Sequence, residues 1–226
     1  MRSNMTLLSS IEKSTLSIIK ALIERGLADH FTMPSVVSNN KYTGDIGFAS
    51  GVDISWAMKD QPYADLYAEL IRRQQFHVVL PDGGALQFLY KVRLDKITKH
   101  RLAFYPNPSL KPFDTDSMRY LQDSVWGHVV SEFQMPVVVR LDYESTPESY
   151  KAIQHSSSHM TLGQYPNCRI PVSSPFTPWA FTDLILRNFY SKAFEPLSRA
   201  NIYKCLPFED CLKREEMNHM HLRLPA

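Results

Sequence analysis

Apolar residues recur three and four positions apart in several segments of the chain, which is the spacing of an amphipathic helix. In the first segment, Gly26 stands where a helix would end. Pro62 directly precedes the second segment, and Thr177, a good N-cap residue, precedes the last, which Pro196 would end or bend. The pattern predicts helices over residues 7–27, 63–74, 116–130 and 179–194.

Between these helices the apolar period falls to two, the period of a strand with one buried face. Residues 86–92 alternate most clearly, and the turn sequence Asp82-Gly83-Gly84 predicts a hairpin with residues 76–80. The expected fold class is α+β, with an antiparallel β-sheet packed by the N-terminal helix and by the apolar C-terminal helix. The other strand-like segments are residues 46–49, 101–105, 137–143, 160–163 and 169–172.

Length and composition favour one globular α+β domain over residues 1–226, since 44% of the residues are hydrophobic and 21% are charged. Residues 200–226 are a candidate peripheral tail, in which residues 209–223 mix charges and methionines as an exposed terminal helix would. The formal net charge is only +2, so no overall field indicates a nucleic-acid or membrane partner.

The cysteines and the apolar runs bear on location. Three cysteines, Cys168, Cys205 and Cys211, cannot form a closed set of disulfides, which fits a reducing compartment. The first residues lack the apolar core of a signal peptide, and no apolar run approaches the roughly 20 residues that span a bilayer. We therefore expect a cytoplasmic protein with no membrane partner.

Polar side chains gather around the strand at residues 137–143. Alternation places Arg140 and Asp142 on one face, and a neighbouring strand would bring His159 to that face as well. His155 and Ser158 would then lie at the rim of a polar pocket. Buried strands do not need such groups, because each costs free energy if it is desolvated without a partner. The cluster is therefore either a site or a satisfied structural network.

As a site, the cluster has the groups for metal-independent cleavage of a phosphodiester such as RNA, which supplies its own 2′-hydroxyl nucleophile. A histidine exchanges protons near neutral pH, so His159 would be the general base or acid and His155 its complement. Arg140 would hold the phosphate, and Asp142 would orient the histidine. Alternatively, the Arg–Asp pair only ties two strands together, and the sequence leaves this open.

Metal binding is a further alternative that the spacing does not favour. His155 and His159 are four residues apart, but the three serines between them make a poor helix interior, and in an extended chain the histidines would be about 13 Å apart. Either histidine could join Asp142 in a transition-metal site. No recognised ligand spacing occurs, nor do the C-terminal cysteines and histidines have zinc-finger spacing, so we expect no metal and no cofactor.

A basic hairpin offers a candidate surface for RNA. Residues 72–101 hold seven lysines and arginines against two aspartates, with Tyr90 among them. Such a surface contacts phosphates and stacks bases, although a solvated hairpin with lysines protecting its edge has the same composition. The residues expected to bind nucleic acid are Lys91, Arg93, Arg101 and Arg169.

The segments 139–143, 155–163, 169–172 and 175–190 resemble a bacterial family of unknown function, domain of unknown function twenty-two ninety. That family often has a histidine where this chain has Thr161, so the resemblance implies that one member of the cluster is missing. The chain is also loosely similar to small bacterial toxin ribonucleases built on a compact antiparallel sheet. This similarity implies a toxin–antitoxin or phage-defence setting with a protein partner encoded nearby.

The same setting suggests a non-catalytic alternative. The chain would then be an interaction subunit of a defence or toxin–antitoxin complex. The apolar helix at residues 179–194 and the tail methionines Met217 and Met220 would dock the partner. An open cleft lined by the polar cluster favours an enzyme, whereas a buried network beside an exposed apolar patch favours an interaction subunit.

Overall fold

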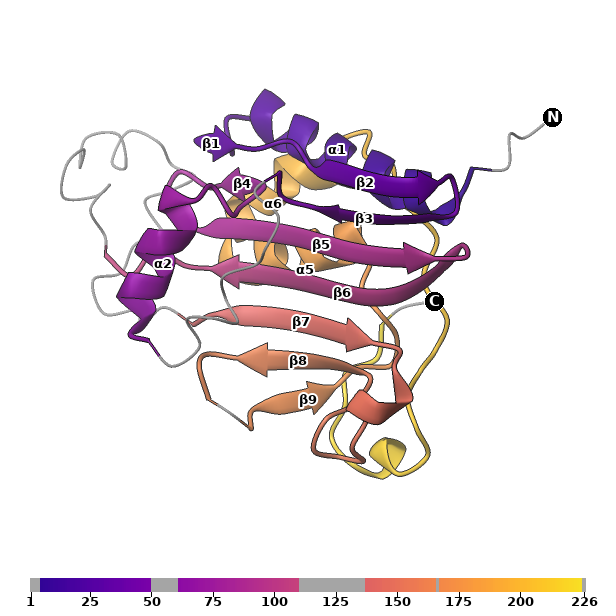
Figure 1. Ribbon diagram of the computed structural model, residues 1–226. Helices are drawn as coiled ribbons and strands as arrows, with labels where there is room; N and C mark the ends of the chain where they lie inside the picture. Colours follow the sequence, from indigo (N-terminus) through magenta and orange to yellow (C-terminus); the bar gives the residue numbers. More distant parts are fainter. Residues whose placement is uncertain (1–4, 50–60, 110–136, 166, 225–226) are drawn as a thin grey trace.

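An open antiparallel sheet forms the centre of the protein, which confirms the α+β class (Figure 1). The computed structural model describes residues 5–49, 61–109, 137–165 and 167–224, and within them nine strands form one sheet. The order is β1-β4-β5-β6-β7-β8-β9, and β2 joins through β3 to β5. The strands are β1 (His30–Phe31), β2 (Ser35–Asn40), β3 (Thr43–Gly47), β4 (Val78–Val79), β5 (Ala85–Arg93), β6 (Lys96–Tyr105), β7 (Val139–Glu144), β8 (Ser158–Leu162) and β9 (Arg169–Pro171).

Two turns set the register of the central strands. Before β5, the carboxylate of Asp82 accepts a hydrogen bond from the N–H of Gly84 (2.9 Å), and Gly83 has a φ of 88°, so the predicted turn is confirmed. Leu94 and Asp95 join β5 to β6 with φ values of 51° and 60°. Two positive φ values in a two-residue loop match the twist of the paired strands.

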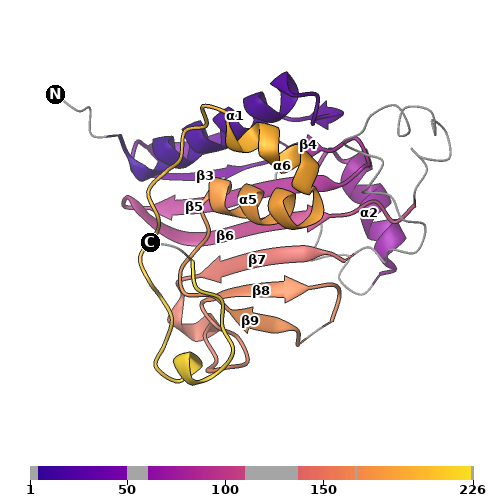
Figure 2. The same ribbon diagram turned by 180° about the vertical axis from the view of Figure 1, so that it is seen from behind.

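The helices α1 (Leu7–Glu24), α5 (Pro178–Phe189) and α6 (Ser191–Ser198) lie behind the sheet (Figure 2). Thr177 caps α5 as predicted, because its hydroxyl accepts a hydrogen bond from the N–H of Ala180 (3.1 Å). The segment predicted as one helix is divided at Tyr190, and Pro196 lies inside α6 instead of ending the run.

The apolar side of α5 is buried in the protein's own core. Phe181 and Ile185 have no exposed surface, and the Phe181 ring packs edge-on against Phe88 of β5 with ring centres 5.6 Å apart. The partner-docking surface predicted at residues 179–194 is therefore occupied by the sheet on this side of the helix.

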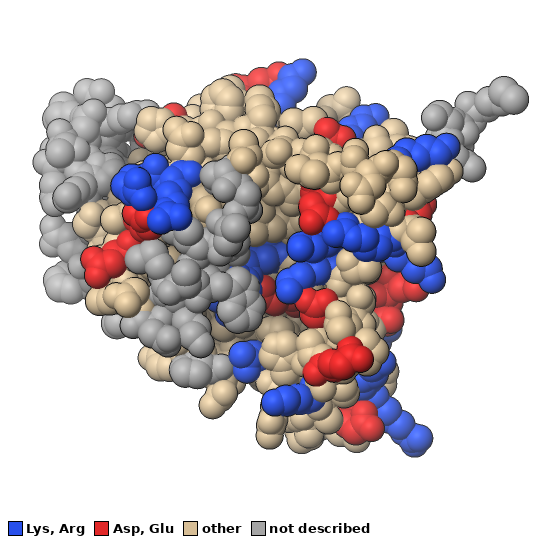
Figure 3. Space-filling model, viewed as in Figure 1, with Lys and Arg blue, Asp and Glu red and all other residues tan. Residues whose placement is uncertain are grey.

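The opposite, front face of the sheet is divided between an apolar end and a charged middle. Helix α2 (Tyr63–Arg72) covers the apolar end, where Leu66 and Leu70 pack against Ala103, Tyr105 and Val138. Lysine and arginine side chains gather across the middle of this face with carboxylates between them (Figure 3). Of the helices that the structure describes, α2 is the one on this face, and it covers the apolar end; the candidate site lies in the charged middle.

The C-terminal segment follows the sheet without the helix predicted at residues 209–223. Its backbone is tied to the chain around β9, since Leu222 N–H donates to the carbonyl of Pro171 (2.9 Å), and one short 3-10 helix, η2 (Glu216–Asn218), interrupts it. A second, η1 (Pro147–Ser149), follows β7. The helix predicted at residues 116–130 lies outside the described residues. None of the described helices has the length and apolar character needed to cross a membrane.

Candidate active site

Strand register brings the predicted polar residues into one row on the front face. Asp142 of β7 pairs with Arg101 of β6 on one side and with His159 of β8 on the other. Two residues along the strands, and so on the same face, Arg140 pairs with Thr161. Because side chains directly opposite one another in an antiparallel sheet share a face, the predicted grouping of Arg140, Asp142 and His159 is confirmed.

Asp142 is held as a carboxylate between two guanidinium groups. One oxygen accepts from Arg101 Nε (2.7 Å) and the other from Arg140 Nε (2.8 Å), while only 15% of the Asp142 side chain is exposed. Burial alone would raise the pKa of Asp142, but the two arginines outweigh it and hold that pKa well below its usual range. Asp142 therefore fixes the arginines and does not donate protons near neutral pH.

Replacing Asp142 by asparagine should lower the free energy of unfolding by about 2 kcal/mol, because it leaves the buried guanidinium of Arg101 without its carboxylate. Denaturant unfolding at pH 7 measures the loss. The matched control is Asp183→Asn, which breaks an exposed Asp183–Arg187 pair on α5 and should cost less than about 1 kcal/mol. Equal losses for the two variants would contradict a special role for the Asp142 network.

His159 is set up as a neutral base. Its Nδ1 lies 2.8 Å from the carbonyl oxygen of Ser156, and a carbonyl can only accept, so Nδ1 carries the proton. The other nitrogen, Nε2, then has a lone pair. Burial lowers the pKa of His159 and outweighs the opposite effect of Asp142, so the ring is neutral at pH 7.

His155 lies against His159. Their ring centres are 4.8 Å apart, and two backbone hydrogen bonds between His155 and Lys151 (2.8 and 3.0 Å) hold the loop that carries it. The Nδ1 atom of His155 is buried and has no hydrogen-bond partner among the described residues. The structure therefore pairs the two predicted histidines and leaves His155 with unused hydrogen-bonding capacity.

A cleft of about 800 Å³ opens beside the pair of histidines. Its wall includes His155, Arg169 and Lys151, the side-chain amides of Gln154 and Asn167, and the carboxylate of Glu148. His159, which is 4% exposed, is not among the residues that line the cleft. The side chain of Arg169 is half-buried and forms no hydrogen bond or ion pair with any residue that the structure describes, whereas its backbone N–H donates to the carbonyl of Asn167 (2.9 Å). Among the described lining residues, the two cations outnumber the one carboxylate, Glu148, so a histidine, two amides and a net positive charge around one cleft suit an anionic ligand that also carries hydrogen-bonding groups.

Ser158 is not brought to the cluster. It neighbours His159 in β8, and its hydroxyl donates to the carbonyl of Ser174 (3.0 Å) in the buried layer behind the sheet. Successive residues of a strand face opposite sides, so Ser158 and His159 cannot share a pocket on one face. Ser158 therefore helps to fix the chain before α5.

The four residues predicted to bind nucleic acid fall into two groups. Arg101 lies within the Asp142 network, and Arg169 lines the cleft. Lys91 and Arg93 instead contact the carboxylate of Asp45 on β3, at 3.6 Å for Lys91. The predicted surface is therefore partly neutralised at its β3 end.

Sequence reasoning missed Lys151, Gln154 and Asn167, which line the cleft. They belong to loops, where no periodicity relates residue spacing to a shared face, so the sequence held no signal for them. Among the described residues, no three His, Cys, Asp or Glu side chains gather in a way that could hold a metal ion.

The chain was compared with known protein families, curated proteins and solved structures. Residues 27–224 match the family DUF2290, described as an uncharacterized conserved protein. The chain belongs to this family. The DUF2290 match spans every strand and the α2, α5 and α6 helices, so the candidate site lies wholly inside the family's region. No curated protein and no solved structure matches the chain significantly.

Proposed function

We propose that this DUF2290 protein is a metal-independent ribonuclease. The observation that carries the proposal is the contact between the His155 and His159 rings, tilted by 57° with their centres 4.8 Å apart, beside a cleft that is lined by His155, Arg169 and Lys151. One histidine has a free lone pair, and the other has an unpartnered nitrogen. General acid–base chemistry on an anion uses groups of these kinds.

The reaction follows from the RNA 2′-hydroxyl as nucleophile. Nε2 of His159 takes the 2′ proton as O2′ bonds to phosphorus, and His155, as the general acid, gives a proton to O5′ as the P–O5′ bond breaks. The products are a 2′,3′-cyclic phosphate and a 5′-hydroxyl, so atoms and protons balance. Arg140 uses only its Nε toward the described residues, which leaves its Nη groups to hold the phosphate with Arg169.

The test uses single-stranded RNA and DNA of one sequence, each with and without EDTA. We expect RNA to be cleaved to 2′,3′-cyclic phosphate ends at a rate that EDTA does not change, and DNA to stay intact because it lacks the nucleophile. Loss of cleavage in EDTA, or cleavage of DNA, would contradict the mechanism. No cleavage in any condition would overturn the catalytic proposal.

The alternative is an interaction subunit of a toxin–antitoxin or phage-defence complex. One observation favours it, namely that three large apolar side chains of the C-terminal segment are exposed, Leu206 (83%), Met217 (57%) and Met220 (76%). The two proposals agree if the protein is a toxin ribonuclease that a partner neutralises. The test is co-purification with the product of the adjacent gene. Co-purification that is lost in a Leu206→Ser/Met220→Ser variant would support an interaction through this segment.

A further inference from the structure

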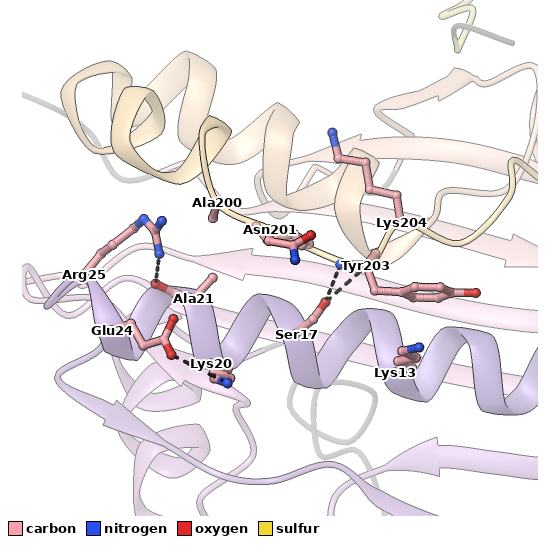
Figure 4. A pocket seen from close by; sticks show the side chains of 11 residues that line it. Lys13, Ser17, Lys20, Ala21, Glu24, Arg25, Ala200, Asn201, Tyr203 and Lys204 are labelled. Atoms are coloured by element: carbon pink, nitrogen blue, oxygen red, sulfur yellow. Dashed lines mark hydrogen bonds and ion pairs between the residues drawn. The ribbon is translucent and has the colours of Figure 1, made fainter.

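A second cavity lies behind the sheet, between the outer side of α1 and the chain that follows α6 (Figure 4). Its volume of about 600 Å³ is within the range of ligand sites. It is separate from the candidate active site, which lies on the front face (Figures 1 and 2). The residues that matter here are Lys13, Lys20, Arg25, Asn201, Tyr203 and Lys204.

Positive charge in this groove exceeds negative charge. Among the described residues, Glu24 is the only carboxylate in its lining, and it pairs with Lys20 at 3.7 Å. Lys13, Arg25 and Lys204 have no carboxylate within ion-pair distance among the described residues. For a chain whose net charge is only +2, three uncompensated cations in one groove are a local excess that favours an anion.

Neutral groups hold these three cations in place. The ammonium of Lys13 lies 4.5 Å from the centre of the Tyr203 ring, and that of Lys204 lies 4.3 Å from the Trp179 ring. Arg25 donates from Nε to a backbone carbonyl of α6 (2.9 Å). Such contacts position a charge without neutralising it, so each cation remains able to bind an anion.

The wall opposite α1 is fixed before any ligand binds. The N–H of Tyr203 donates to the hydroxyl of Ser17 (3.1 Å), and the Tyr203 hydroxyl lies 3.0 Å from that of Ser10. Both serines belong to α1, so the 200–204 segment is tied to the helix at two points (Figure 4). A preformed groove loses little conformational entropy on binding.

The groove is long, with cations at both ends. Lys13 and Arg25 are twelve residues apart along α1, which is about 18 Å at 1.5 Å per residue. One phosphate cannot reach both ends, whereas a strand with several successive phosphates can. The Asn201 amide lies between the two ends, where it can hydrogen-bond to a base, and the Tyr203 ring lies at the Lys13 end, where it can stack on one (Figure 4).

We propose that this groove binds the phosphate backbone of single-stranded RNA, apart from the candidate active site. The probe is a fluorescent 2′-O-methyl RNA dodecamer, which cannot undergo attack by the 2′-hydroxyl, so binding is measured whether or not the protein is a ribonuclease. We expect the Lys13→Gln/Lys204→Gln variant to bind at least 10-fold more weakly. Its salt dependence should be less steep by about 1.4 in log–log slope.

Two controls separate this groove from other basic surface. In Lys41→Gln the lost ammonium also lies over a tyrosine ring, that of Tyr42 at 4.8 Å, but outside the groove, and binding should not change. Lys151→Gln alters the front cleft. The proposal is overturned if the wild type does not bind the dodecamer, if the groove variant binds as tightly as Lys41→Gln, or if only Lys151→Gln weakens binding. Adenosine monophosphate binding as tightly as the dodecamer would overturn the assignment to a strand.

Discussion

Replacing His159 by glutamine should lower the rate of RNA cleavage by a factor of about 10² to 10⁴, the usual contribution of a general base. Glutamine removes the Nε2 lone pair, which the hydrogen bond from Nδ1 to Ser156 leaves unprotonated in the neutral ring. The same bond is a local contact between residues three apart, so the free energy of unfolding should change by no more than about 1 kcal/mol. Initial rates and denaturant unfolding on the same preparations measure both quantities.

The matched control is His30→Gln, because the His30 side chain is 71% exposed on β1 and lies outside the cluster. Its cleavage rate should equal that of the wild type. A second variant, His155→Gln, should lose activity to a similar extent because it removes the group that gives a proton to the leaving oxygen. If His159→Gln unfolds the protein, or if it cleaves RNA at the wild-type rate, the general-base role is wrong and the cluster is a structural network.

The grouping of Arg140, Asp142 and His159 was predictable because the two-residue period of a strand tells which side chains share a face of the sheet. That rule placed Arg140 and Asp142 on one face, and the register then set His159 opposite Asp142. The same rule excludes Ser158, the immediate neighbour of His159, which the prediction overlooked. Arg101 was predicted to bind nucleic acid and not to contact Asp142. The local pattern does not specify which strand lies beside β7, because that is set by the topology of the sheet.

The missed parts of the fold have similar physical causes. The turn at Leu94 and Asp95 contains no glycine, although both residues adopt positive φ. Strand β2 is polar and at the edge of the sheet, so it lacks the apolar alternation that marks a half-buried strand. The tail at residues 209–223 has helix-forming composition, but Cys211 and Leu222 donate their backbone hydrogen bonds to the chain around β9, and only one short local turn forms between them.

Lowering the pH from 7 to 5 should destabilise the protein by about 4 kcal/mol, because two histidines are buried in the neutral form. Burial lowers the pKa of His77 and that of His100 to about 4 from an ordinary 6.5. Between these values the unfolded chain binds more protons than the folded one, so stability falls as the pH falls. Each histidine contributes about 2 kcal/mol of this loss at pH 5.

Hydrogen bonding adds to burial, which is the main reason why the pKa of His100 is lowered. Its Nδ1 lies 3.1 Å from the Leu141 carbonyl and therefore donates, while its Nε2 accepts from the N–H of Phe176 (3.0 Å). A second proton would face that N–H directly, so protonation would break the link between the sheet and the chain leading into α5. Similarly, Nδ1 of His77 accepts from the N–H of Phe88 (3.1 Å) and cannot be protonated without losing that bond.

Urea unfolding between pH 7.5 and pH 5 measures the effect as the slope of stability against pH. A His100→Gln variant should be less stable at pH 7, since it loses two hydrogen bonds, but its slope should be shallower by up to about 1.4 kcal/mol per pH unit. The exposed His30→Gln control should keep the wild-type slope. A wild-type slope near zero in this range would mean that the pKa values of these histidines are the same in the folded and the unfolded chain. Burial would then not lower them, and the prediction would be wrong.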